Sequence, residues 1–278
     1  MMKKISIAFI LVTLGICLRA VGITGTCCSL VVPFWGKYKI LEPKDSKILN
    51  RNLKKGATRL ESICKKLSLS CGQVCWEIPN ALLRSCNIEL PGYNRTCGSK
   101  VAPISDRRAS IILDDIGLVS DYSAEEVRKS LKKINKYKQS FDPLTVSLVC
   151  WVDGLMVVHE KRDSSNSGDK ITVALKVASQ DDKLGKITSS LNTQISKHLG
   201  IPIDKQVACI PLVTFLNLER EQASQLIEQL KELKESLAFD KKSFTVRQFY
   251  FKKFCSQKGT TMIGPWEIQN FNLKIVRK

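Results

Sequence analysis

The stretch Ile210-Pro211-Leu212-Val213-Thr214-Phe215 is a short apolar run in the C-terminal half of the chain. Runs of this length and composition are typical of a buried β-strand, and we expect the strand to extend over 207–216. Apolar residues after it recur every three or four positions from Leu226 to Leu237. This second pattern predicts an amphipathic helix that packs against the strand.

The rest of the C-terminal region, 105–278, also alternates between strand and helix patterns. A capping box that begins at Ser123 predicts one helix, and the apolar spacing over 184–199 predicts another. Asp153-Gly154 is typical of a hairpin turn. The predicted strands are 109–113, 143–151, 155–159, 171–177, 207–216, 244–254 and 266–276. This order predicts an α+β domain with a mixed sheet and helices on one side.

Residues 1–22 have the pattern of an export signal. Lys3 and Lys4 form a short positive head, an apolar stretch follows over 5–18, and small residues stand at 20–22. The apolar stretch is shorter than the roughly 20 residues that cross a bilayer, and the alternatives are an uncleaved anchor or an ordinary core segment. We therefore expect an exported protein, periplasmic, cell-surface or extracellular, with no transmembrane helix in the mature chain.

Most of the 11 cysteines lie in an irregular N-terminal region over 23–104. In an exported chain such a group is typical of disulfide bonds. The disulfide candidates are Cys27, Cys28, Cys64, Cys71, Cys75, Cys86 and Cys97. Zinc is the alternative, but the spacing is not a paired Cys-x2-Cys form and no histidine stands nearby in the sequence, so we expect no metal site. Because seven is odd, one thiol is free or pairs with a later cysteine or with another chain.

Regular structure is also expected within the cysteine-rich region. The apolar spacing over 46–69 predicts one or two helices interrupted at Gly56, and 76–79 predicts a short strand that ends at proline. The predicted organisation is thus a signal peptide over 1–22, a cysteine-rich region over 23–104 and an α+β domain over 105–278.

The chain is strongly basic, with a formal net charge of +18. Removing residues 1–22 takes away Lys3, Lys4 and Arg19 and no carboxylate, so the net charge falls to +15. Such a charge favours phosphate backbones, acidic lipids or acidic polysaccharides. It is equally typical of lysines that only keep an exported protein soluble. The partner is therefore open: an anionic ligand or another protein.

The order of elements and loops from about 102 to 276 resembles the two-histidine phosphoesterase superfamily, the RNA ligase-like cyclic phosphodiesterases. Two stretches carry the resemblance, one over 110–117 before the Ser123 cap and the other over 211–215. The resemblance implies a two-lobed mixed or antiparallel sheet with helices packed outside. It also implies that each lobe gives a His-x-Thr strand to a central cleft, where the histidines act as acid and base and the threonines hold phosphate without a metal or cofactor.

The motif positions of this chain are changed. Ser110 and Ile112 stand where the first histidine and threonine are expected, and Leu212 and Thr214 stand at the second pair. Imidazole suits acid–base work because its pKa lies near neutral pH, and neither motif provides one. The two histidines of the chain, at 159 and 198, have no Thr or Ser two residues later and are interpreted as structural. No catalytic residue and no cofactor are expected.

These observations predict an exported binding or interaction protein on a phosphoesterase-like scaffold, more consistent with a protein that is not an enzyme. One alternative is a divergent phosphodiesterase that acts on nucleotide or RNA phosphates through Ser110, Thr214 and nearby lysines. Without a base, Ser110 is a weak nucleophile. The other alternative is an envelope or surface structural protein in which the cysteines crosslink neighbouring chains.

Overall fold

The computed structural model describes residues 26–70, 72–88, 110–119, 124–126, 128–129, 148–161, 168–199, 207–255 and 259–267. The expected signal peptide over 1–22 lies outside these residues, as do Cys71 and Cys97. In the described part of the chain no helix is long and apolar enough to cross a membrane.

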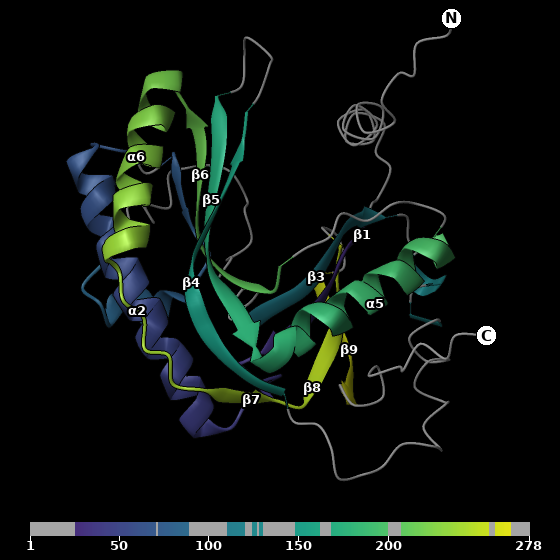
Figure 1. The fold of residues 1–278 in the computed structure, drawn as a ribbon. Coiled ribbons are helices and arrows are strands. Elements are labelled where there is room, and N and C mark those ends of the chain that lie inside the picture. Colours follow the sequence, from purple (N-terminus) through teal and green to yellow (C-terminus); the bar gives the residue numbers. More distant parts are fainter. Residues whose placement is uncertain are drawn as a thin grey trace, which may run out of the picture.

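The described residues form one antiparallel sheet of nine strands with helices against it (Figure 1). This confirms the α+β class. The strands are β1 Thr26–Pro33, β2 Val74–Trp76, β3 Ser110–Val119, β4 Leu148–Glu160, β5 Asp169–Ser179, β6 Cys209–Leu218, β7 Phe244–Val246, β8 Gln248–Cys255 and β9 Gly259–Glu267. The helices are α2 Pro43–Lys66, α3 Asn80–Arg84, the short η3 Gln180–Asp182, α5 Lys183–Leu199 and α6 Arg220–Ser236.

Strand β6, the strand predicted from the 210–215 run, joins two parts of the sheet. One part has the order β7-β4-β5-β6, and β2 pairs with β6 on the edge that does not face β5. The other part has the order β3-β1-β8-β9. Between the two parts the ladder has a single described pair, Ile112 of β3 opposite Cys209 of β6. The first part is therefore paired to the second only at the start of β6.

Helices α2 and α6 lie side by side against the first part of the sheet, and α5 contacts β4 and β5 of the first part and β3 of the second (Figure 1). Each of these helices carries an apolar stripe because its large apolar residues recur at helical spacing. In α2 the fully buried stripe includes Leu49, Leu53 and Leu60, and in α6 it includes Leu226 and Leu230. The core therefore lies between these helices and the sheet.

The expected boundary at residue 104 does not divide the fold. Strand β1, from the cysteine-rich region, lies between β3 and β8, and β2 pairs with β6. Leu30 and Val32 of β1 are fully buried, because a strand with partners on both edges and a covered face belongs to the core. Residues 26–88 are thus part of the same folded unit as the C-terminal strands.

The hairpin expected at Asp153-Gly154 is absent, because β4 runs straight through these residues. Val152 pairs with Val177 and Gly154 pairs with Lys176, so Asp153 is an extra residue in a β-bulge. Gly154 has φ 153°, a backbone conformation that glycine adopts readily. The Lys176 ammonium lies 2.8 Å from the Asp153 carboxylate and lowers the pKa of that carboxyl through their hydrogen bond. The partner of β4 is β5, across residues 161–168.

Three other predicted boundaries change. Helix α2 continues through Gly56 without an interruption. The strand expected over 244–254 divides at Arg247 into β7 and β8, which pair with β4 and β1 respectively. The strand expected over 266–276 begins at Gly259, since β9 pairs with β8, and residues beyond 267 lie outside the description.

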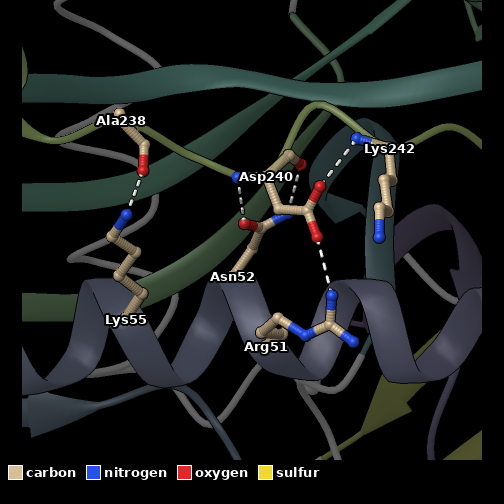
Figure 2. Close-up of polar contacts among 6 residues, drawn as sticks. All are labelled: Arg51, Asn52, Lys55, Ala238, Asp240 and Lys242. Carbon is tan, nitrogen blue, oxygen red and sulfur yellow. Dashed lines mark hydrogen bonds and ion pairs between the residues drawn. The ribbon is translucent and has the colours of Figure 1, made fainter.

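Polar side chains of α2 hold the connection between α6 and β7 (Figure 2). The side-chain amide of Asn52 donates to the Asp240 carbonyl at 3.0 Å and accepts from the Asp240 amide at 2.9 Å. Lys55 donates to the carbonyl of Ala238. Asp45, at the start of the helix, accepts from the amide of Thr245 at 3.0 Å. The connection is therefore held along its length by one helix.

The carboxylate of Asp240 completes this contact. It accepts from the backbone amide of Lys242 at 3.1 Å and pairs with the Arg51 guanidinium at 2.8 Å. The amide of Lys242 and then Arg51 lower the pKa of the Asp240 carboxyl. Asn52 is 1% exposed, whereas the Arg51 side chain is 60% exposed, so the amide contributes more to stability than the ion pair.

Asn52→Ala is expected to lower the free energy of unfolding by about 1–3 kcal/mol, because it leaves the amide and carbonyl of Asp240 without partners. Arg51→Ala, in the same contact but exposed, is expected to cost less than about 1 kcal/mol. Urea denaturation of both variants measures the difference. Equal losses would show that the buried amide has no special role.

Candidate functional site

The candidate site lies on the face of the sheet turned away from α2. Leu175 of β5 lies toward α2, since a Cβ on Gly56 would be 3.8 Å from its Cδ2 atom. Side chains alternate along a strand, so Thr172 of β5 points to the opposite face. Thr214 of β6 is the ladder partner of Thr172 and shares its face. We call this surface the Thr214 face.

Leu212, the residue in place of the second expected histidine, does not lie on the Thr214 face. Val173 pairs with Val213 and Ala174 with Pro211, so Leu212 is the extra residue of a β-bulge. The bulge turns its side chain toward α2, where a Cβ on Gly56 would be 3.0 Å from the Leu212 Cδ1 atom. Leu212 is fully buried. The residue two places before Thr214 therefore serves the core and not the site.

Thr214 itself is bound to a buried carboxylate. Its hydroxyl donates to Glu77 Oε1 at 2.9 Å, and the two residues are 8% and 7% exposed. The backbone amide of Glu77 donates to the Leu212 carbonyl at 2.8 Å, which extends the β2 ladder by one step. The hydroxyl of Thr172 lies 3.4 Å from that of Thr214. These contacts place a buried carboxyl group where the resemblance predicts a phosphate.

Sequence reasoning did not select Glu77 or Thr172 as site residues. Glu77 had a signal, because it stands between Trp76 and Ile78 in a segment predicted as a strand, where a carboxylate is unexpected. Thr172 alternates with buried residues in β5, which is the ordinary pattern of a strand. Its proximity to Thr214 depends on the strand register, which no local pattern reveals.

The first motif lies on the same face as Thr214. Ile112 of β3 is opposite Cys209 of β6, and Cys209 is opposite Lys176. Because Lys176 and Thr172 are four residues apart in one strand, all of these side chains share a face. Ser110, two residues before Ile112, points to the same face and is 6% exposed. Three of the four motif positions thus share a face, and Leu212 is the exception.

Among the described side chains, no histidine lies on this face. His159 is the ladder partner of Ile171, which neighbours Thr172 and therefore points the other way. Its Nε2 atom lies 2.7 Å from Asp169 Oδ2. His198 lies in α5, and its side chain is outside the description. The interpretation of His159 as a structural residue agrees with this pairing.

The cysteine prediction is not supported where the structure describes the side chains. Cys64, Cys75 and Cys86 are thiols and form no disulfide among the described residues. Burial raises the pKa of the Cys64 thiol to about 12, and nearby Glu61 adds to the rise. Cys64 lies on the buried side of α2. Its thiol packs there as an apolar side chain and does not form the disulfide that the composition predicted.

The remaining candidates, Cys27 and Cys28, are neighbours in β1. Cys27 is exposed and Cys28 is buried, since successive strand residues point to opposite faces. Within the described part of the chain, no three His, Cys, Asp or Glu side chains are grouped so that they could hold a metal ion.

The comparisons with known proteins add no assignment. No protein-family model, no curated protein and no solved structure matches the chain. The resemblance to two-histidine phosphoesterases thus stays a prediction from sequence, and function is argued from the geometry of the site.

Leu212→His, which restores the expected histidine in the sequence, is expected to destabilise the protein without adding activity. The imidazole would be buried beneath α2 in place of leucine, at a cost of about 2–5 kcal/mol. Leu212→Met keeps the apolar volume and should cost less than about 1.5 kcal/mol. Urea denaturation and a cyclic-phosphodiester assay test both points. A stable, active Leu212→His protein would contradict the assigned direction of this side chain.

Cys64 and Cys150 are expected to resist alkylation in the folded protein. Burial raises the pKa of each thiol to about 12, so almost none of the reactive thiolate is present at neutral pH. Mass spectrometry after iodoacetamide treatment should find both cysteines labelled only when the protein is unfolded, without any reductant. If unfolding alone left either residue unlabelled until reductant was added, the residue would be in a disulfide.

Proposed function

We propose that this chain is an exported, non-catalytic binding protein. The observation that carries the proposal is the hydrogen bond from Thr214 to the buried carboxylate of Glu77, 2.9 Å long. A hydroxyl has a single proton to donate. Thr214 is the one motif position that keeps the expected residue type. Its hydroxyl proton is thus already donated to another residue of the protein.

The position of Glu77 acts in the same direction. Its buried carboxyl oxygen lies 2.9 Å from the Thr214 hydroxyl and occupies the acceptor position that a phosphate oxygen would need there. Phosphate-transfer sites instead place cations or uncharged donors around the anion. The Thr214 face is therefore unsuited to hold a phosphodiester in position for cleavage.

Acid–base chemistry lacks its residues as well. Leu212 lies beneath α2, and Ser110 stands at the first histidine position with no imidazole beside it among the described residues. His159 is bound to Asp169 and points to the other face. A two-histidine reaction needs one imidazole to take a proton and another to deliver one, and the described part of this face holds no imidazole.

The proposal of export is supported by the sequence of residues 1–22, with its lysine head and apolar stretch. An exported protein with a high positive charge meets anionic polymers and surfaces outside the cytoplasm. Binding is thus a function that needs no catalytic residues and that suits the charge of the chain.

The test is hydrolysis of 2′,3′-cyclic nucleotides by the purified protein. We expect no turnover above the buffer rate, and no change with Thr214→Ala, because Thr214 performs no chemistry. Glu77→Gln serves as a second variant, since it removes the carboxyl group and keeps an acceptor for Thr214. Turnover by the natural protein that disappears with Thr214→Ala would overturn the proposal.

A further inference from the structure

The solvent side of α2 carries a strong positive charge. Between Pro43 and Lys66 the helix has eight lysines and arginines against two carboxylates, a net charge of +6. The neighbouring α6 has three cations and four carboxylates, a net charge of −1. We call the exposed cations of α2 the α2 basic face; its members are Lys44, Lys47, Arg51, Lys55, Arg59 and the Lys65-Lys66 pair, with half-buried Lys54 among them.

The arrangement follows from helical geometry. At about 100° per residue, the eight cations fall within an arc of roughly 140°, and the buried residues of α2 fall on the opposite side. That opposite side packs on the sheet through Leu49, Leu53 and Leu60 and holds the 238–242 connection through Asn52 (Figure 2). The cations are thus held on one face of a helix whose opposite face is packed in the core.

Only part of this charge is balanced within the described part of the protein. Lys44, Arg51 and Lys65 pair with Glu42, Asp240 and Glu61 respectively. Lys55 and Lys66 donate to neutral oxygens, which leaves their charge uncompensated. No carboxylate among the described residues forms an ion pair with Lys47, Lys54 or Arg59. Lys241 and Lys242 are also exposed in the connection that α2 holds, and they add to the same surface.

We propose that the α2 basic face binds the phosphate backbone of a nucleic acid, independently of sequence. From Lys44 to Lys66 the helix rises about 33 Å, so the eight cations lie on average about 5 Å apart along its axis. Phosphates along one DNA strand are spaced about 3.4 Å apart. The helix therefore carries positive charge at a density of the same order as the phosphates of a nucleic acid strand, with three of its eight cations paired to carboxylates. The inference rests on the proposed binding function and assigns it a surface and a ligand.

Two other polyanions fit the surface less well. A helix that binds a bilayer inserts an apolar face between the lipids, but the apolar side of α2 is in the core. The exposed large apolar residues of the described chain are Val149, Val158 and Val207, none of them in α2. A sparsely carboxylated polysaccharide has fewer charges per length than the helix can meet. Charge complementarity thus favours nucleic acid.

The experiment measures fluorescence anisotropy of a labelled DNA duplex of random sequence with the full chain across a salt series. Binding should weaken steeply between about 50 and 200 mM salt. The triple variant Lys47→Gln, Lys54→Gln, Arg59→Gln should bind at least about tenfold more weakly at low salt, and the slope of log K against log salt should fall by up to about 3, near 0.9 per lost phosphate contact.

The matched control removes the same charge from α5, through Lys183→Gln, Lys186→Gln and Lys197→Gln. These lysines are exposed, and α5 lies apart from α2 (Figure 1). The control should keep affinity and slope within about twofold of the natural protein, since its lysines lie outside the proposed contact. Thermal denaturation establishes that both triple variants are folded.

Three outcomes would overturn the inference: equal losses in the two triple variants, binding to phosphatidylserine vesicles or heparin without binding to duplex, and no binding to any polyanion. The hydrolysis assay with Thr214→Ala does not depend on any of them. A failure of this inference is therefore distinguishable from a failure of the proposed absence of catalysis.

Discussion

The contact between Gly56 of α2 and Leu212 of β6 governs how the rest of the structure is arranged. A side chain at position 56 would place its Cβ 3.0 Å from the Leu212 Cδ1 atom, so the hydrogen of glycine lets the helix backbone lie close to the strand. Leu212 and Leu175 fill the space beneath it. With this side of α2 fixed in the core, its polar residues reach the 238–242 connection and its cations remain in solvent.

The same contact separates fold from chemistry at the candidate site. The bulge that brings Leu212 to the helix leaves Thr214 on the opposite face, where it meets Glu77 and Thr172. Two residues that would act together on a regular strand thus serve different purposes, one in packing and one in a polar contact across strands. A local change of backbone register is enough to turn two residues of one strand segment to opposite faces of the sheet.

The sequence predicted the helices and the central strands well, because their apolar spacing is a direct consequence of burial on one side. The 184–199 and 226–237 patterns correspond to α5 and α6, and 171–177 and 207–216 correspond to β5 and β6. Asp153-Gly154 misled because the same residues suit a turn and a bulge. The pairing of β4 with β5 on both sides of Asp153 determines that a bulge forms here and not a turn.

The candidate site was less predictable. Ser110, Ile112 and Thr214 do share a face, as a strand pattern implies, but the direction of Leu212 and the proximity of Glu77 arise from pairing between distant strands. The disulfide prediction relied on composition alone, whereas Cys64 is buried by the spacing of α2. The redox compartment and the number of cysteines determine whether disulfide bonds are possible. Packing in the core determines which thiols are buried.

The central position of β1 has a consequence for how the molecule is made. Thr26 to Val31 pair with residues 250–255, near the other end of the described chain. Closing so long a loop is entropically costly, and folds rich in such distant contacts assemble slowly. During synthesis β1 emerges long before residues 250–255, so one of its edges has no partner until these residues have been translated. An open strand edge can pair with another chain and cause aggregation. The nascent polypeptide is therefore most prone to aggregate at β1, a strand that is paired on both edges in the folded protein.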